Sequence, residues 1–158
     1  TIHLGDPVAT ENDIAARKLP DLPFTLVGQQ YLADPTRSTG NLNPIWAYAH
    51  VPAGYRGDVT SHILTHIEHH APGFHDQIEQ VWSRSVQQLE DDNPNYSGGD
   101  IAGGANTLRQ LVARPRLRAP YDTGVPGVYL ASASTPPGGG VHGMAGYHAA
   151  RRALELYG

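Results

Sequence analysis

Four glycines stand within six positions near the end of the chain, at Gly138, Gly139, Gly140 and Gly143. Glycine has no Cβ, so the backbone of such a turn can come close to a ligand. An apolar run at 128–130 precedes the turn and a helix is expected to follow it. That helix would aim its free N–H groups and positive dipole end at the ligand. The segment therefore predicts a site for an electron-rich or anionic group. The alternative is a tight corner between a strand and a helix.

The same glycines match the pattern G-x-G-x-x-G, but their setting differs from that of a dinucleotide-binding turn. That turn opens a strand–helix–strand unit and has an acidic residue about twenty positions further on. Here a single helix follows, and Glu155 within it is the only acidic residue after the glycines. The pattern therefore indicates a strand, loop and helix that close a domain.

The residues around this turn resemble the C-terminal flavin-binding motif of the phytoene desaturase-like FAD-dependent oxidoreductases, in the carotenoid desaturase and amine oxidase group of flavoproteins. Residues 135–141 (TPPGGGV) resemble the T-x-P-G-G-G-V loop of that family, and residues 122–127 (DTGVPG) resemble its lead-in. Residues 95–101 (NYSGGDI) and 109–115 resemble its Gly-Gly-Asp and Arg-Pro segments. The broader group often has an acidic residue just after the strand. This chain has small residues at 132–134, as the desaturase branch does.

The resemblance implies that FAD is the cofactor and that its isoalloxazine ring lies at the closing motif. Backbone N–H groups from Gly140 to His142 would then face the N1/C2=O region of the ring, where negative charge accumulates on reduction. Asp100 and Tyr96 are candidates for the substrate side, although an aspartate between glycines is also a common turn former. No catalytic residue and no metal ligand is assigned. The residues expected to contact the cofactor are Ser132, Ala133, Ser134, Gly139, Gly140, Val141, His142 and Met144.

The function implied by the resemblance is oxidation, desaturation or isomerisation of an apolar, isoprenoid-type small molecule by a flavoprotein oxidoreductase. The 158 residues hold no phosphate-binding G-x-G-x-x-G turn ahead of this motif. The chain is therefore expected to be the C-terminal fragment of a longer enzyme, inactive and without retained FAD by itself. Its partner would be the missing N-terminal FAD-binding part of the same protein. The alternative function is a freestanding binding or assembly module that derives from such a flavoprotein and has no catalysis.

Composition excludes several other classes of protein. A net charge of −4 with a single lysine argues against binding to nucleic acid. The absence of cysteine excludes disulfides, thiolate metal sites and a thiol nucleophile. No apolar run approaches the roughly 20 residues of a membrane span, and a cytoplasmic location is expected. Self-association of the chain and peripheral contact of the whole enzyme with a membrane are left open.

The pattern of elements predicts a mixed α/β fold in two parts. Residues 1–95 are expected to form the substrate-side segment, an antiparallel sheet with helices. Residues 96–158 would form the closing strand–loop–helix of an FAD-binding Rossmann-type domain. Strands are expected at 2–4, 24–28, 45–51, 78–82 and 128–130. Helices are expected at 11–18 with Thr10 or Asn12 as cap, at 59–70 with Asp58 or Thr60 as cap, at 86–89, at 106–112 and after Gly143.

Two groups of charged or titratable residues have alternative interpretations. His62 and His66 are one helical turn apart and could bind zinc together with His69 or Glu68. Because no further dedicated ligand stands near them in the sequence, we instead expect solvated histidines beside the apolar stripe of the helix. The basic run Arg109, Arg114, Arg116 and Arg118 is expected to be a solvated face or to pair with Asp100 and Asp122, with phosphate binding as the alternative. Ala145, Ala149 and Ala153 form a smooth stripe along the last helix.

Overall fold

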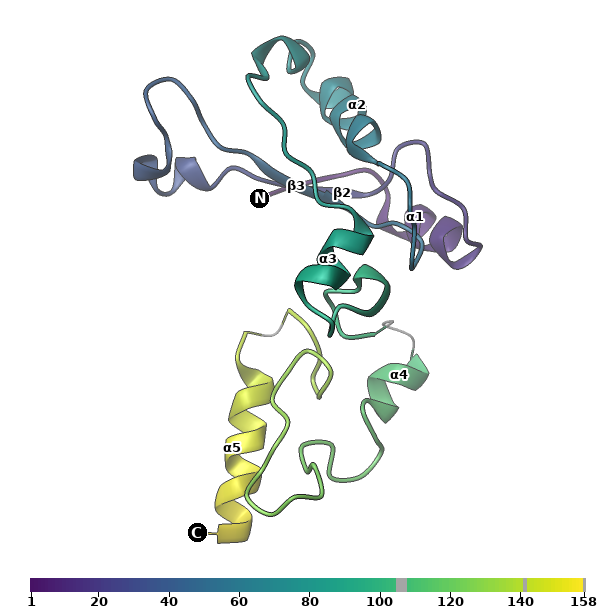
Figure 1. Cartoon of the computed structure of the whole chain (residues 1–158), viewed down its shortest axis with the longest axis vertical. Helices are drawn as coiled ribbons and strands as arrows, with labels where there is room; N and C mark the ends of the chain where they lie inside the picture. The colour runs from purple at the N-terminus through teal and green to yellow at the C-terminus, as the bar shows by residue number, and fades with distance from the viewer. Residues whose placement is uncertain (105–107, 141, 158) are drawn as a thin grey trace. The chain divides into compact units, whose positions relative to one another are not determined.

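The computed structural model describes residues 1–104, 108–140 and 142–157 as a mixed α/β protein. The chain divides into two compact units, Thr1–Asp92 (the N-terminal unit) and Asn93–Gly158 (the C-terminal unit) (Figure 1). The assignment of the two parts to substrate and cofactor stays a prediction. Within the described residues, no helix is both long and apolar enough to cross a membrane.

A three-stranded antiparallel sheet forms the centre of the N-terminal unit (Figure 1). Its strands are β1 (Ile2–Leu4), β2 (Thr25–Gly28) and β3 (Trp46–Ala49), in that order. In the register of this sheet, Val27 of β2 lies opposite both Ile2 and Ala47. The strands expected at the start of the chain, at 24–28 and at 45–51 are thus confirmed, each within a residue or two of its expected ends.

Helix α2 (Thr60–His70) covers one face of this sheet and closes the core. Leu4, Val27 and Ile67 are buried together, and Ala47, Ile63 and Phe74 pack against them. The helix begins where the Oδ1 atom of Asp58 accepts a hydrogen bond from the backbone N–H of Thr60, at 2.8 Å. Asp58 therefore satisfies one of the free donors of the first turn. The N-cap residue itself is Val59, whose side chain makes no capping hydrogen bond, so the expected cap at Asp58 or Thr60 is wrong by one residue.

The opposite face of the sheet carries a row of rings in contact. The ring centroids of Trp46 and Tyr48 are 5.0 Å apart, and those of Tyr48 and His50 are 5.8 Å apart. Phe24 continues the row, 5.9 Å from His50 and 5.6 Å from His3. Trp46, Tyr48 and His50 are two residues apart along the strand and therefore share this face.

Two elements of the N-terminal unit differ from the prediction. Helix α1 (Pro7–Ala15) begins four residues earlier than expected, because Asp6 accepts hydrogen bonds from Val8 and Ala9 and Pro7 fits the first helical position. The expected strand at 78–82 is wrong, since this segment pairs with no strand of the sheet. Its Trp82 side chain is 80% exposed. Helix α3 (Val86–Asp92) extends the short helix expected there.

Short 3-10 helices complete the connections in both units. They span Gln30–Leu32 (η1), Pro35–Arg37 (η2), His75–Gln77 (η3) and Ser97–Gly99 (η4). In the C-terminal unit, α4 (Leu108–Ala113) overlaps the helix expected at 106–112 and ends one residue later, while residues 106 and 107 are outside the described ranges. The closing helix α5 (Met144–Tyr157) follows the glycine-rich turn as predicted.

The buried closing strand expected at 128–130 is wrong. Tyr129 makes one isolated antiparallel bridge with Asp122, and the N–H of Leu130 donates to the carbonyl oxygen of Tyr121 at 2.7 Å. Val128 is 50% exposed and Leu130 41% exposed. A central strand needs a neighbour on each side, and the described residues of the C-terminal unit supply only this bridge. A Rossmann-type sheet is not present in that part of the chain.

Candidate functional site

The glycine-rich turn and the first turn of α5 surround a hollow of about 330 Å³. Most of the side chains around it are glycine, alanine or serine, so backbone atoms and small side chains form its walls. Met144, Ala145 and Gly146 belong to the helix, whose N-terminus therefore opens into the hollow. The hollow is lined by Ala131, Ser132, Ala133, Gly138, Gly139, Gly140, His142, Gly143, Met144, Ala145 and Gly146.

The hollow brings together six of the eight residues that were expected to contact a cofactor: Ser132, Ala133, Gly139, Gly140, His142 and Met144. Ser134 is not part of this lining, and Val141 lies outside the described residues. On the substrate side, neither Asp100 nor Tyr96 is among the residues that line it. Most of the residues expected to contact the cofactor thus lie next to one another in space. The two residues expected on the substrate side, Asp100 and Tyr96, do not line this hollow.

Thr135 fixes the loop that precedes the glycines. Its side chain is fully buried. Its hydroxyl accepts from the N–H of Ser132 at 3.2 Å and donates to the carbonyl oxygen of Ser132 at 2.8 Å. Its own carbonyl accepts from the N–H of Gly138 at 2.8 Å. These bonds fold 132–138 into successive turns, which hold the glycines at the rim of the hollow.

The glycine backbone follows a path that few other residues could adopt. Gly138, Gly140 and Gly143 have φ values of +103°, +80° and +82°, in the region that L-residues avoid. A Cβ added at Gly140 or Gly143 would meet no atom within 4 Å. Glycine is therefore required at these positions by the backbone conformation, and the space beside them is open.

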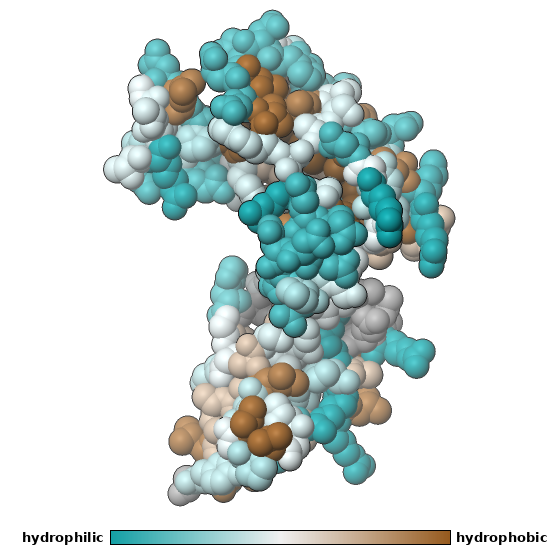
Figure 2. All heavy atoms as spheres, in the orientation of Figure 1, coloured by the Kyte–Doolittle hydropathy of each residue, from teal (hydrophilic) through white to brown (hydrophobic). Residues whose placement is uncertain are grey.

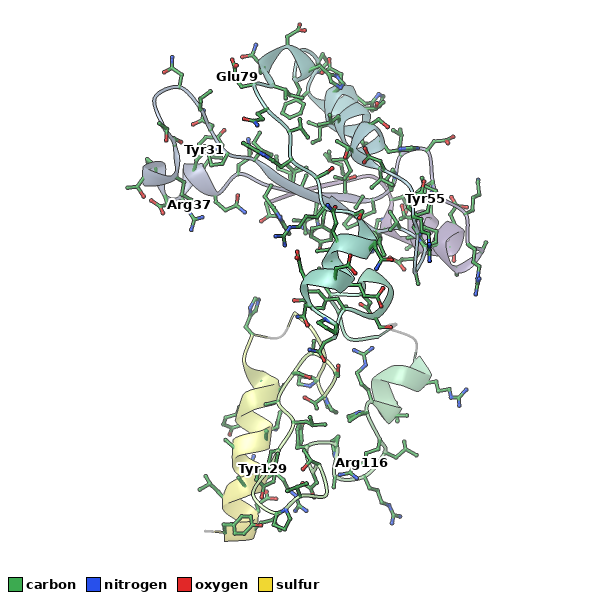
Figure 3. All side chains as sticks on the ribbon, viewed as in Figure 1. Tyr31, Arg37, Tyr55, Glu79, Arg116 and Tyr129 are labelled. Atoms are coloured by element: carbon green, nitrogen blue, oxygen red, sulfur yellow. The ribbon has the colours of Figure 1, made fainter. Side chains whose placement is uncertain are left out.

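Arg114 is buried beneath this loop, 7% exposed. Its Nη1 atom donates to the carbonyl oxygen of Ala133 at 3.3 Å and to that of Ala102 at 3.4 Å. The expectation of a solvated side chain is thus wrong for Arg114, because the loops on either side enclose its guanidinium. Arg109 and Arg118 are exposed, as expected. Arg116 (Figure 3) is also exposed, and its guanidinium donates to the carbonyl oxygens of Ala119 and Asp122.

Asp100 organises the neighbouring loop. Its carboxylate accepts hydrogen bonds from the backbone N–H groups of Ala102, at 2.7 Å, and of Gly104. A Cβ built at Gly103 would lie 2.8 Å from the Oγ atom of Ser134. The 100–104 loop thus packs closely against the loop that carries the glycines. These contacts favour the interpretation of Asp100 as a turn former.

A second hollow of about 560 Å³ lies along α5 in the same unit. At its edge Arg152 binds Asp122 with two parallel hydrogen bonds, Nε to Oδ1 at 3.1 Å and Nη2 to Oδ2 at 2.9 Å. The hydrogen bond from Arg152 holds the pKa of Asp122 below its usual value. The sequence did not predict this pair, whose members are thirty residues apart. The hollow is lined by Ala119, Pro120, Tyr121, His148, Arg151, Arg152 and Glu155.

The closing helix is attached to the rest of the unit by several such contacts. The rings of Tyr121 and His148 stack with centroids 6.2 Å apart. Tyr129 (Figure 3) lies on the loop beside α5, and burial raises the pKa of its hydroxyl. Ala149 is the buried member of the predicted alanine stripe, with Ala145 and Ala153 half-buried.

The histidines of α2 occupy two environments. His66 is 2% exposed, so its expected solvation is wrong: α2 turns this ring toward the sheet instead of the solvent. Its Nδ1 atom lies 3.0 Å from the carbonyl oxygen of Pro23 and 3.5 Å from Oγ1 of Thr25. Burial lowers the pKa of His66. His69 is exposed, and no group of three or more potential ligands among the described residues is arranged to hold a metal ion.

The first hollow can be tested for its fit to a flavin. A flat ring needs walls without projecting side chains. Because Gly140 and Gly143 have no Cβ, the space beside their backbone stays open. The anionic form of a reduced flavin would be stabilised by the N-terminus of α5. The residues present therefore fit the ring end of the cofactor. Comparison of the chain with protein-family models, with curated proteins and with solved structures gave no match.

Proposed function

We propose that the chain is the closing part of the FAD-binding domain of an oxidoreductase that acts on an apolar, isoprenoid-type small molecule. The observation that supports it most is the hollow at the start of α5, whose lining includes six residues of the flavin motif that the sequence resembles. This agreement is independent of the pattern itself, because residues 131–133, 138–140 and 142–146 need not have enclosed a common space.

In this proposal the residues of the hollow bind and orient the cofactor. Gly139 and Gly140 let the ring approach the backbone, and Ser132 and Ala133 form the facing wall without bulk. The N-terminus of α5 stabilises the negative charge that the ring acquires on reduction, because the helix dipole is oriented toward it. Bound FAD supplies the hydride chemistry itself. The chain thus contributes position and electrostatics.

The exposed apolar side chains of the C-terminal unit support the proposal that another part of the same protein packs against this unit. Val128, Leu130, Leu154, Leu156 and Tyr157 are each at least 41% exposed, and hydrophobic patches lie on the visible surface of this unit (Figure 2). Surfaces of this kind normally pack against protein. We propose that the phosphate-binding part of the same protein covers them and holds the adenine and pyrophosphate of FAD, so that the 158 residues alone retain none.

The sheet of the N-terminal unit supports the choice of an apolar substrate. Trp46 is 51% exposed and heads the row of rings that runs through Tyr48 to His50 and Phe24. Aromatic rings on a half-exposed face offer a large apolar contact area at low cost in conformational entropy. A hydrocarbon substrate would bury this surface more favourably than a charged one would.

The experiment that tests this function compares two glycine variants of the full-length protein, expressed from the natural reading frame that contains these residues. Gly140→Val places a β-branched side chain in the hollow at a backbone φ of +80°. Gly124→Val is the matched control: Gly124 has a φ of +89°, open space beside it, and no part in the lining. Bound flavin is measured as absorbance per folded molecule.

We expect the wild type and Gly124→Val to retain flavin, and Gly140→Val to lose most of it. A folded full-length protein that neither retains nor takes up FAD would contradict the proposal and favour the alternative, a binding or assembly module without catalysis. Equal flavin content in the two variants would instead show that Gly140 only shapes the corner and that the ring lies elsewhere.

A further inference from the structure

We propose that the second hollow of the C-terminal unit, which lies along α5, is a binding site for a small aromatic carboxylate. The hollow has a volume of about 560 Å³, within the range of about 300–1,000 Å³ that is typical of small-molecule sites. It shares no lining residue with the hollow at the start of α5. The proposal therefore goes beyond the flavin and does not depend on its presence.

One face of α5 supplies most of the side chains that line this hollow. These residues follow one another at spacings of three or four, so they share a face of the helix. Residues 119–121, which come from the preceding loop, complete the lining. The four helical residues are His148, Arg151, Arg152 and Glu155.

The rings of Tyr121 and His148 give the hollow an aromatic wall. Their planes are 21° apart and their centroids are 6.2 Å apart. Rings in full face contact would be only about 3.5–4.0 Å apart, so each ring leaves part of its surface uncovered by the other. The hydroxyl of Tyr121 donates to the carbonyl oxygen of Pro136 at 3.1 Å, which fixes the position of this ring. The wall therefore offers a surface on which a flat ligand ring can stack.

The two arginines of the hollow have different surroundings. Arg152 binds the carboxylate of Asp122 through two hydrogen bonds, and its Nη1 atom lies 3.9 Å from Glu155. Arg151 is exposed, and its guanidinium lies 6.0 Å from the ring centroid of Tyr147. Among the described residues, no carboxylate forms an ion pair with Arg151. Its planar fork of N–H groups matches the two oxygens of a ligand carboxylate.

Glu155 favours a ligand with one negative charge over a ligand with two. Its side chain lies one helical turn after Arg151 and lines the same hollow. Apart from His148, the charged side chains of the hollow and Asp122 carry no net charge, because two arginines stand against two carboxylates. A ligand carboxylate gains the contact with Arg151, whereas the second charge of a phosphate would be repelled by Glu155.

The loop that completes the hollow is held in its shape by contacts of its own. Arg116 (Figure 3) donates to the carbonyl oxygen of Ala119 at 3.0 Å and to that of Asp122. Ala119 has a φ of +47°, which residues with a Cβ rarely adopt. Such a conformation persists only where the surrounding contacts enforce it, and it is frequent at ligand sites. The loop is therefore preorganised for a ligand.

The test measures the binding of naphthoate to the full-length protein by titration calorimetry. Three comparison ligands each change one property: naphthamide lacks the charge, cyclohexanecarboxylate lacks the flat ring, and naphthyl phosphate carries a second negative charge. The variants are Arg151→Gln and Glu155→Gln, both at exposed positions, and His148→Ala. Arg118→Gln is the matched control, because Arg118 is an exposed arginine of the same unit that does not line the hollow.

We expect the wild type to bind naphthoate about tenfold or more tightly than naphthamide, because a charge-assisted contact distinguishes the two. Arg151→Gln should bind naphthoate about tenfold more weakly and naphthamide with unchanged affinity. His148→Ala should weaken the binding of both, since both stack on the ring. Glu155→Gln should strengthen the binding of naphthyl phosphate more than that of naphthoate. Arg118→Gln should match the wild type.

Several results would overturn the proposal. Naphthoate that binds no more tightly than naphthamide or cyclohexanecarboxylate would do so, as would equal affinities in Arg151→Gln and Arg118→Gln. A wild type that prefers naphthyl phosphate would overturn the choice of a carboxylate. The titrations are made with and without bound FAD, and equal affinities are expected. Naphthoate binding that depends on FAD would place the ligand at the flavin instead, whereas a protein that holds no flavin at all leaves this expectation unchanged.

Discussion

The two units of this chain are stabilised in different ways. The N-terminal unit buries Leu4, Val27 and Ile67 between a sheet and a helix. Among the described residues of the C-terminal unit, Ala149 is the one buried hydrophobic side chain, whereas Arg114 and Thr135 are buried polar ones. The first unit thus has an apolar core, which drives folding by itself. The second is ordered by hydrogen bonds from buried polar groups, which contribute less net stability.

The charges of the two units also differ in sign. Residues 1–92 carry twelve Asp and Glu against five Lys and Arg, a net charge of −7. Residues 93–158 carry three acidic residues against six arginines, a net charge of +3. A basic unit with little core and a small-residue hollow is suited to an anionic ligand and to a covering partner. The difference in charge supports the proposal that the anionic ligand binds to the C-terminal unit.

The largest expected effect is a difference in hydrogen exchange between the units of the 158-residue chain. Amides of β2, which bond to strands on both sides, should exchange roughly a thousandfold more slowly than the amides of Leu130 and Gly138, because local opening in a region without a core costs little free energy. The measurement is exchange followed by mass spectrometry of peptides from each unit. Equal protection in both units would contradict the comparison and show that the polar contacts suffice.

The sequence predicted the N-terminal unit well, for reasons visible in particular residues. Residues 24–28 combine β-branched and aromatic side chains, and Asp58 stands immediately before a helical apolar pattern. Both signals are local, so they could be read without knowledge of the fold. The start of α1 was missed, although Asp6 and Pro7 are themselves a strong start signal. The segment 78–82 was misread because the residue pattern does not reveal whether a partner strand exists.

For the C-terminal unit, the sequence predicted the glycine-rich turn but not how the surrounding segments pack. Gly138, Gly140 and Gly143 predicted a backbone open to close approach, which depends only on the local chain. The strand at 128–130 failed because its burial depends on neighbours that the described residues do not supply. Arg114 and the Asp122–Arg152 pair could not be found, since their partners are twelve or more residues away. Local signals identified the candidate site, while the contacts that hold it are long-range.

The next effect concerns His66, which is the largest fully buried side chain of the N-terminal unit. His66→Ala should lower the free energy of unfolding by about 2–4 kcal/mol, through a cavity and an unpaired Pro23 carbonyl. His69→Ala is the control, because His69 is exposed on the same helix. Both variants are measured by urea unfolding followed by tryptophan fluorescence. A loss in His66→Ala no greater than that in His69→Ala would show that this ring is not part of the core.

The pH dependence of the same unit tests His66 more specifically. Burial lowers its pKa below the usual 6.5, so the unfolded chain binds the proton more tightly than the folded one. Stability from the neutral ring is therefore complete above pH 6.5 and is lost as the pH falls below that value toward the lowered pKa. His66→Gln, which keeps a side-chain donor without titrating, should flatten this slope, and an unchanged slope would assign it to other histidines.

The smallest effect is expected at Asp122 and Arg152, which join α5 to the preceding loop of the C-terminal unit. Arg152→Ala removes both hydrogen bonds to Asp122 and should speed exchange of the α5 amides, whereas Arg151→Ala, an exposed neighbour, should leave them unchanged.

Arg152 holds the pKa of Asp122 below 3.8, so the contribution of this pair is present above that pH and is lost as the pH falls below it. The wild type should therefore lose the extra protection of α5 under acid conditions, and Arg152→Ala should show no such loss. Acid sensitivity that persists in Arg152→Ala would assign the attachment of α5 to the stacked rings of Tyr121 and His148 instead.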